Sequence, residues 1–202
     1  MPKTERLHNI DNLRGFAIFV MVIANASPYL FTGEFALLLR VLFSVAAPIF
    51  IFLSGFSFQL SLEKGKSWTE MIRRALQIGL AAILIDTFIW HIAPFQTFDV
   101  LYLISGGLFV LIVIRHFNEY VKIGIIASVI LFTFLVQANI GYRFNIPDSE
   151  FNFSTSFVSV YNSTDTFKRA FIDGWFPFFP WFAVALLGSL VKMKLEWIKK
   201  YK

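Results

Sequence analysis

The chain has 202 residues, of which 57% are hydrophobic and 15% charged, and its 26 phenylalanines help to give a mean hydropathy of +0.67. This composition excludes an ordinary water-soluble domain and is typical of a chain whose solvent is mostly lipid. The absence of cysteine excludes disulfides and thiolate metal sites. The three histidines are scattered and lack the spacing of metal ligands, so no metal is expected. The net charge is +5.

Six apolar runs are long enough to cross a hydrocarbon core of about 30 Å, which needs roughly 20 helical residues. They lie at residues 14–32, 36–62, 71–93, 98–115, 120–138 and 174–193. We therefore predict one all-α domain over residues 1–202. It is expected to be a polytopic membrane bundle of about six transmembrane helices, with a long outer loop at 139–173.

Lysine and arginine predict the orientation of this bundle, because short loops rich in these residues stay cytoplasmic. With the N-terminus inside, only four of the 18 cations fall on or near the outer side: Arg40, Arg143, Lys168 and Arg169. Both termini are therefore predicted to be cytoplasmic. Topology and anionic lipid headgroups explain the positive charge, so no nucleic acid partner is expected. The expected location is the cytoplasmic membrane of a prokaryote.

The first apolar run combines a charged start with a buried amide. Asp11 is expected to cap the helix, and Arg14 would lie at the depth of the lipid phosphates. Asn25 lies about 16 Å further along, in the outer half of the membrane, where an isolated amide more often joins helices than serves catalysis. Residues 24–26 also fit a signal-peptide cleavage site, although Asp11 before the apolar run favours a retained helix.

The second run carries Arg40 near the outer surface and a face of small residues that includes Gly55. Such a face lets another helix approach closely, so we interpret it as a packing surface first and a ligand groove second. The short amphipathic segment that follows carries Lys64, Lys66, Arg73 and Arg74. These cations are expected to bind lipid phosphates or a soluble anionic cofactor.

Polar residues converge in the outer half of the predicted bundle, at Asn25, Arg40, Asp86, His91 and Asp99. Intramembrane ionisable groups usually face a partner or a cavity. These positions therefore predict either an ion pair of Arg40 with Asp86 beside a wet interface, or a functional site. Asp86 and His91 do not share a helix face, so if His91 has a carboxylate partner, Asp99 is the better candidate.

The last two runs frame the long loop. The fifth run has no ionisable group after Lys122 and is expected to face lipid. Aromatic residues in the loop 139–173 indicate that it lies on the outer interface as a lid or binding surface. Asp173 is expected to cap the sixth helix, with Pro177 and Pro180 near its start.

Four blocks of sequence occur in a recognisable order: IDNLRGFAIFVMVIAN, APIFIFLSGFSFQLS, FDVLYLISGGLFVL and FPFFPWFAVALLG. Together they resemble the heparan-α-glucosaminide N-acetyltransferase catalytic domain family of transmembrane acyltransferases. The resemblance implies transfer of an acetyl or other acyl group from cytosolic acetyl-CoA to a sugar-type acceptor across the membrane. It implies that Arg14, with Arg73 and Arg74 by position, binds the nucleotide phosphates. Asn25 would stabilise charge on the thioester oxygen.

The chain departs from the family pattern at the histidines. Ala36 and Tyr102 stand where relatives carry histidine. His91, with Asp86 and Asp99, is therefore the expected substitute for the catalytic base. Arg40 and Tyr102 would contact substrate or support the structure.

Two alternatives to an acyltransferase stay open. A non-catalytic bundle, acting as a scaffold or subunit, would have kept the family fold and lost its base. A small transporter would need inverted repeats, which the sequence does not show. Membrane lipids are expected partners in every case, and a homo-oligomer is compatible with each.

Overall fold

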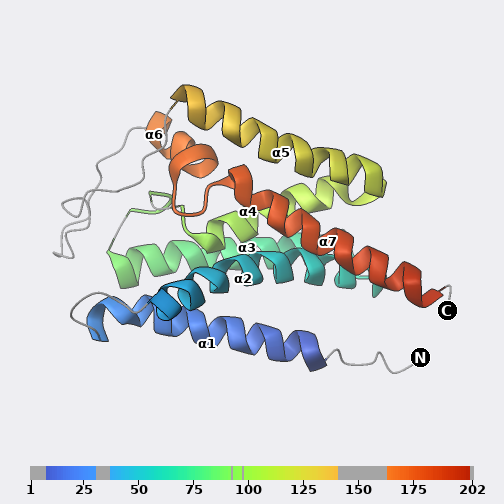
Figure 1. The fold of residues 1–202 in the computed structure, drawn as a ribbon, viewed down its shortest axis with the longest axis horizontal. Coiled ribbons are helices and arrows are strands. Elements are labelled where there is room, and N and C mark those ends of the chain that lie inside the picture. Colours follow the sequence, from blue (N-terminus) through green and yellow to red (C-terminus); the bar gives the residue numbers. More distant parts are fainter. Residues whose placement is uncertain (1–7, 31–36, 92, 97, 141–162, 201–202) are drawn as a thin grey trace.

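The computed structural model describes residues 8–30, 37–91, 93–96, 98–140 and 163–200. Within these ranges the chain is helical and has no β-strand (Figure 1). The predicted all-α fold is therefore confirmed. Two of the described helices are long and apolar enough to cross a membrane, at Ser44–Glu63 and Glu119–Val136.

Six long helices run alternately up and down the bundle. They are α1 (His8–Leu30), α2 (Leu37–Glu63), α3 (Trp68–Ile85), α4 (Val100–Val113), α5 (Glu119–Ile140) and α7 (Phe178–Lys200). Four short segments connect them: η1 (Asp86–Trp90), η2 (Ile114–His116), α6 (Ser163–Lys168) and η4 (Arg169–Asp173). The start of α1, the α2–α3 turn, the α4–α5 turn and the end of α7 lie together at the right of Figure 1. We name this the basic end, after Lys64, Lys66, Arg115 and Lys194.

The outer surface of the bundle is strongly apolar. Phe19 of α1, Phe88 of η1 and Phe134 of α5 are each more than 60% exposed, and α5 also exposes Ile123 and Leu131. Soluble proteins rarely expose apolar surface on this scale. This surface suits contact with lipid and agrees with the predicted lipid-facing fifth helix.

The most extensive contact between two helices joins α2 to α7. A Cβ atom on Gly55 would overlap the carbonyl oxygen of Ala185, and a Cβ on Gly188 would overlap the carbonyl oxygen of Phe52. At Gly55 the small-residue face of the second run is thus a packing surface, as predicted, whereas Ser54 and Ser57 of the same predicted face line a cavity. The partner of Gly55 is α7 of the same chain.

Polar side chains also join α2 to α7 at the basic end. The Lys192 ammonium is buried and lies 2.5 Å from a carboxylate oxygen of Glu63. One turn deeper, the buried Ser189 hydroxyl donates to the side-chain oxygen of Gln59 at 3.4 Å. Each of these buried polar groups therefore has a partner, which is what an apolar environment requires.

Helix α4 packs in the interior between α3, α2 and α7. Its Leu103 and Leu111 are almost completely buried, and the ring of Phe182 from α7 lies against Gly107. The Ser105 hydroxyl donates to the carbonyl oxygen of Ala75 in α3 at 2.9 Å. These contacts fix the level of α4 relative to α3.

Two predicted helix starts are wrong. Helix α1 begins at His8, so Asp11 lies in its first turn and forms an ion pair with Arg14 at 3.3 Å instead of capping the helix. Asp173 ends η4, whereas α7 begins at Phe178, because the aromatic segment between them interrupts the helix. Pro180 does lie near the start of α7, as predicted.

We expect Gly188→Ala to destabilise the bundle, because the added methyl group overlaps the α2 backbone. Overpacking of this kind costs about 1–3 kcal/mol. Thermal unfolding of the purified protein in detergent measures the loss. Gly124→Ala on α5 is the matched control, since nothing lies within 4 Å of its Cβ position. Equal melting temperatures for the two variants would contradict the prediction.

Candidate functional site

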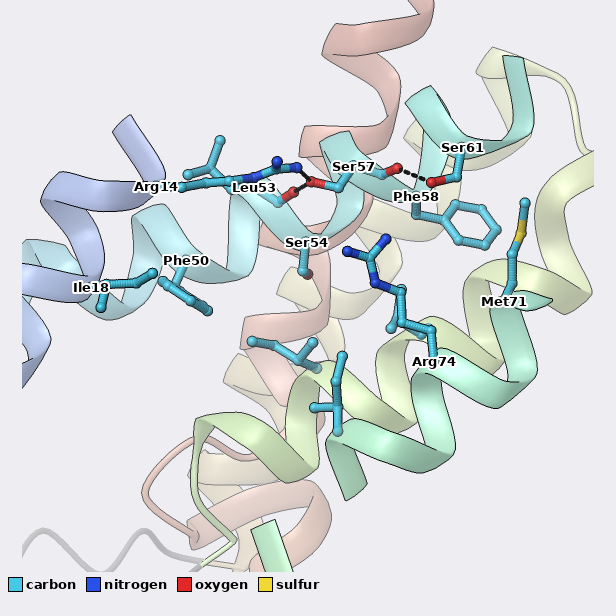
Figure 2. A pocket seen from close by; sticks show the side chains of 13 residues that line it. Arg14, Ile18, Phe50, Leu53, Ser54, Ser57, Phe58, Ser61, Met71 and Arg74 are labelled. Atoms are coloured by element: carbon cyan, nitrogen blue, oxygen red, sulfur yellow. Dashed lines mark hydrogen bonds between the residues drawn. The ribbon is translucent and has the colours of Figure 1, made fainter. Parts of the chain in front are cut away.

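A cavity of about 250 Å³ lies at the basic end between α1, α2, α3 and α4 (Figure 2). We name it the main cavity. Its apolar walls are Ile18, Phe50, Leu53, Phe58, Met71, Ile78, Ile104 and Leu108. Two arginines and a row of serines supply the polar part of its lining.

The two arginines reach the main cavity from opposite helices. Arg14 of α1 donates to the Ser57 hydroxyl of α2, while the Arg74 guanidinium points from α3 toward α2 (Figure 2). Ile18 follows Arg14 by one helical turn, and Ile78 follows Arg74 by one turn. Each helix therefore presents a cation nearer the basic end and an apolar side chain deeper in the bundle.

The serine row lies on one face of α2. The Ser54 hydroxyl donates to the carbonyl oxygen of Ile51 at 2.7 Å, and the Ser61 hydroxyl donates to that of Ser57 at 2.8 Å. Donation to the helix backbone uses the hydroxyl hydrogens, so the oxygen lone pairs can accept hydrogen bonds from a ligand. The polar wall of the cavity thus offers acceptors as well as the two guanidinium groups.

A second pocket, of about 170 Å³, adjoins the main cavity. Ser61, Met71 and Arg74 line both. Lys66, Glu70, Arg73 and Gln77 complete the second pocket, which we name the basic mouth. The two pockets together change from cationic at the surface to apolar inside.

The first turns of α3 line the basic mouth, and Ser67 is the N-cap of that helix. The Glu70 amide donates to the Ser67 hydroxyl at 3.3 Å, and the Ser67 amide donates to the Glu70 carboxylate at 3.0 Å. This capping box starts α3 at Trp68, so Arg73 and Arg74 lie on α3 itself. The positive end of the helix dipole adds to their charge. The structure therefore places the three predicted nucleotide-binding residues, Arg14, Arg73 and Arg74, around adjoining pockets.

At the opposite end of the bundle, Asp86 and Tyr102 form a buried pair. The Tyr102 hydroxyl donates to a carboxylate oxygen of Asp86 at 2.7 Å, and the Phe95 amide donates to the Tyr102 oxygen at 3.3 Å. Both side chains are less than 5% exposed. The structure thus brings two predicted site residues together and gives Tyr102 a partner that the sequence did not indicate.

The structure does not join His91 to the predicted acids. The His91 side chain is exposed. Asp99 instead caps α4, where its carboxylate accepts from the Val100 amide at 2.5 Å. Within the described ranges no hydrogen bond or ion pair links His91 to Asp99, because the chain turns at His91 with a left-handed backbone, at φ 52°. The side chains of Asn25 and Arg40 lie outside the described part of the structure, so their predicted contacts, including an ion pair of Arg40 with Asp86, stay predictions.

The segment from His91 to Asp99 has an unusual backbone. His91, Phe95 and Phe98 have positive φ angles of 52°, 68° and 48°. A non-glycine residue in this region costs of order 1–3 kcal/mol, so the surroundings must hold it. The Tyr102 ring lies 4.8 Å from the Phe95 ring and 5.7 Å from the Phe98 ring. Tyr102 therefore holds the segment through its ring as well as its hydroxyl.

Two more hydrogen bonds fasten this segment to distant parts of the chain. Buried Arg169 donates to the carbonyl oxygen of Gln96 at 2.9 Å, and the Phe176 amide donates to that of Phe98 at 3.1 Å. The sequence assigned no role to Arg169 or Gln96. They are 73 residues apart, and no pattern in the chain relates them.

No group of three or more acidic or histidine side chains within the described ranges has the arrangement of a metal site.

Comparison with known families identifies the chain's relationship. The family described as heparan-alpha-glucosaminide N-acetyltransferase, catalytic, matches residues 6–198, which is nearly the whole chain. No curated protein sequence matches significantly, and no solved structure does.

We expect Tyr102→Phe to loosen the segment that covers Asp86. The change removes a donor to a buried carboxylate and an acceptor for the Phe95 amide, which together cost about 1–3 kcal/mol. Hydrogen exchange of residues 91–99 should accelerate while exchange of α5 stays unchanged.

Tyr120→Phe is the matched control, because Tyr120 is 77% exposed. Equal exchange in the two variants would show that the Tyr102 hydroxyl does not hold this segment.

Proposed function

The chain belongs to the heparan-alpha-glucosaminide N-acetyltransferase catalytic family, and we propose that it is a transmembrane acyltransferase. The proposed reaction moves an acetyl or other acyl group from cytosolic acyl-CoA to a sugar-type acceptor on the other side of the membrane. One observation carries the proposal: a cationic mouth that adjoins a largely apolar cavity at the basic end of the bundle.

The basic mouth fits the charged part of the donor. Lys66, Arg73 and Arg74 supply three cations within one pocket, and phosphate groups bind strongly to such charge-assisted donors. Glu70 lies in the same pocket, but its carboxylate accepts from the Ser67 amide in the capping box. The net charge of the mouth therefore favours a polyanion such as the nucleotide of CoA.

The main cavity fits the rest of the donor. Its apolar walls suit the methylene groups of the pantetheine arm, and Ser54, Ser57 and Ser61 offer acceptors for the amide groups of that arm. Arg14 lies opposite Arg74 across the main cavity, where it would bind a phosphate.

The arrangement of the helices supports the proposed direction of transfer. Six antiparallel passes place the start of α1 and the end of α7 at the same end of the bundle (Figure 1). This end carries most of the cations, which is typical of the cytoplasmic side. We therefore propose six membrane spans with both termini in the cytoplasm.

The proposed chemistry breaks the thioester C–S bond and forms a C–O or C–N bond to the acceptor. The acceptor gives up a proton, and the CoA sulfur receives one on leaving. Asn25 follows Ile18 by two helical turns on α1, about 10 Å toward the opposite end. There its amide would donate to the oxygen on which negative charge develops.

The acceptor side needs a base, and Asp86 is our first candidate. It is a buried carboxylate whose hydrogen bond to Tyr102 orients it. His91 and Asp99 remain candidates for contact with the acceptor, together with Arg40. Because the chain has no cysteine, transfer would be direct or would pass through an oxygen or nitrogen nucleophile.

A non-catalytic bundle is the second candidate function. The observation that favours it is the position of Tyr102, which stands where relatives carry histidine and which is held between Asp86 and Phe95. A tyrosine fixed in this way supports the fold without requiring catalysis.

Binding of labelled acetyl-CoA to the purified protein tests the donor site. We expect saturable binding, weakened about tenfold by Arg74→Ala, because a lost charge-assisted contact is of that order. Lys194→Ala is the matched control: Lys194 lies at the same end but forms an ion pair with Glu119 on α5, away from both pockets. Absence of saturable binding would end the proposal.

Transfer to a panel of amino sugars and neutral sugars tests the chemistry. We expect Asn25→Ala to lower the transfer rate by roughly 10²–10³, the usual cost of removing a donor to a developing oxyanion, while acetyl-CoA binding is kept. The rate is measured as labelled product under saturating donor. Binding of acetyl-CoA without transfer to any acceptor would favour the non-catalytic bundle.

A further inference from the structure

The main cavity opens sideways, toward the surroundings of the bundle. Helix α1 packs chiefly along α2 and helix α3 along α4, so the cavity separates α1 from α3 (Figure 2). Its wall at Ile18 is 51% exposed, and Phe50 and Ile78 are partly exposed. A ligand can therefore reach the apolar walls from the side as well as through the basic mouth.

The depth of this opening matches that of lipid chains. Phe50 and Ser61, at its two extremes on α2, both lie in the span Ser44–Glu63 that is apolar enough to cross a membrane. An apolar groove open to the bilayer loses dispersion contacts if it stays empty. A hydrocarbon chain is the molecule that surrounds it at the highest concentration.

The charges at the basic end of the main cavity favour a lipid with an anionic headgroup. Four cations surround it, Arg14, Lys66, Arg73 and Arg74, against two acids, Asp11 and Glu70. Each acid is partly neutralised by an interaction of its own, Asp11 with Arg14 and Glu70 with the Ser67 amide. Cationic pockets between helices at the cytoplasmic side attract anionic headgroups.

We propose that the main cavity binds one anionic phospholipid of the surrounding membrane. Its phosphate lies between Arg14 and Arg74, and one acyl chain lies along Ile18, Phe50 and Ile78. The lipid occupies the place proposed for the pantetheine arm, so it competes with the acyl donor. The competition rests on the proposed function, whereas the lipid site does not.

Lipid retention tests the site without any measurement of activity. The full chain is reconstituted in nanodiscs of phosphatidylcholine with a minor fraction of phosphatidylglycerol, then extracted with mild detergent. Native mass spectrometry counts the lipid that stays bound. We expect one retained phosphatidylglycerol, which also raises the melting temperature because it binds the folded state.

Three variants show whether this lipid uses the cavity. Arg74→Gln removes one phosphate contact and should lower retention about tenfold. Ser54→Phe fills the groove with a ring, keeps every cation and should abolish retention. Lys194→Gln, at the same end but outside the groove, should leave retention unchanged.

Two results would overturn the lipid site. Equal retention of phosphatidylcholine and phosphatidylglycerol by the unmodified chain would show that the cations do not select the headgroup. Undiminished retention by Ser54→Phe would show that the lipid is held by surface charge alone. The first result needs no variant, so it decides the matter even if Ser54→Phe fails to fold.

Displacement separates this inference from the proposed function. CoA added to the lipid-bound protein should release the phosphatidylglycerol. Binding of CoA without release would overturn the competition and leave the donor site intact. Absence of CoA binding, with lipid still retained, would overturn the proposed acyltransferase and leave the lipid site intact.

Discussion

The contact between α2 and α7 is the constraint on which the rest of the bundle depends. Gly55 and Gly188 let the two backbones touch, and the ion pair of Lys192 with Glu63 closes the contact at the basic end. With one face of α2 held against α7, its opposite face presents Ser54, Ser57 and Ser61 to the main cavity. A packing contact on one side of a helix thus fixes the position of a candidate binding site on the other.

The two ends of the bundle differ in chemistry. At the basic end, cations surround pockets that open to the outside, which suits a charged ligand that enters and leaves. At the opposite end, Asp86 and Tyr102 are buried beneath a segment that Arg169 and Phe176 help to hold. The inner part of the main cavity, at Ile18, Phe50, Ile78 and Ile104, is apolar. Such walls suit a neutral thioester better than an ion.

Local patterns in the sequence were enough to predict the helices and their packing face. The length of the apolar runs indicates the all-α fold, and small residues indicate the packing face at Gly55. Arg14 and Arg74 were predicted to share a ligand, and they line one cavity, although nothing local relates two residues on different helices. The structure does not pair His91 with Asp99, because the chain turns at His91 with a left-handed backbone. The sequence does not indicate this turn, since the position holds no glycine. The Arg169 contact with Gln96 depends on tertiary structure alone.

The three left-handed residues between η1 and α4 have a consequence for divergence within the family. Glycine would adopt these angles at little cost, yet two of the positions hold phenylalanines whose rings rest on Tyr102. The connection between η1 and α4 should tolerate a change of side chain better than a change of length, because an insertion would move the rings of Phe95 and Phe98 away from Tyr102. Relatives that use the same connection should therefore show a constant spacing between the third and fourth helices, even where their residues differ.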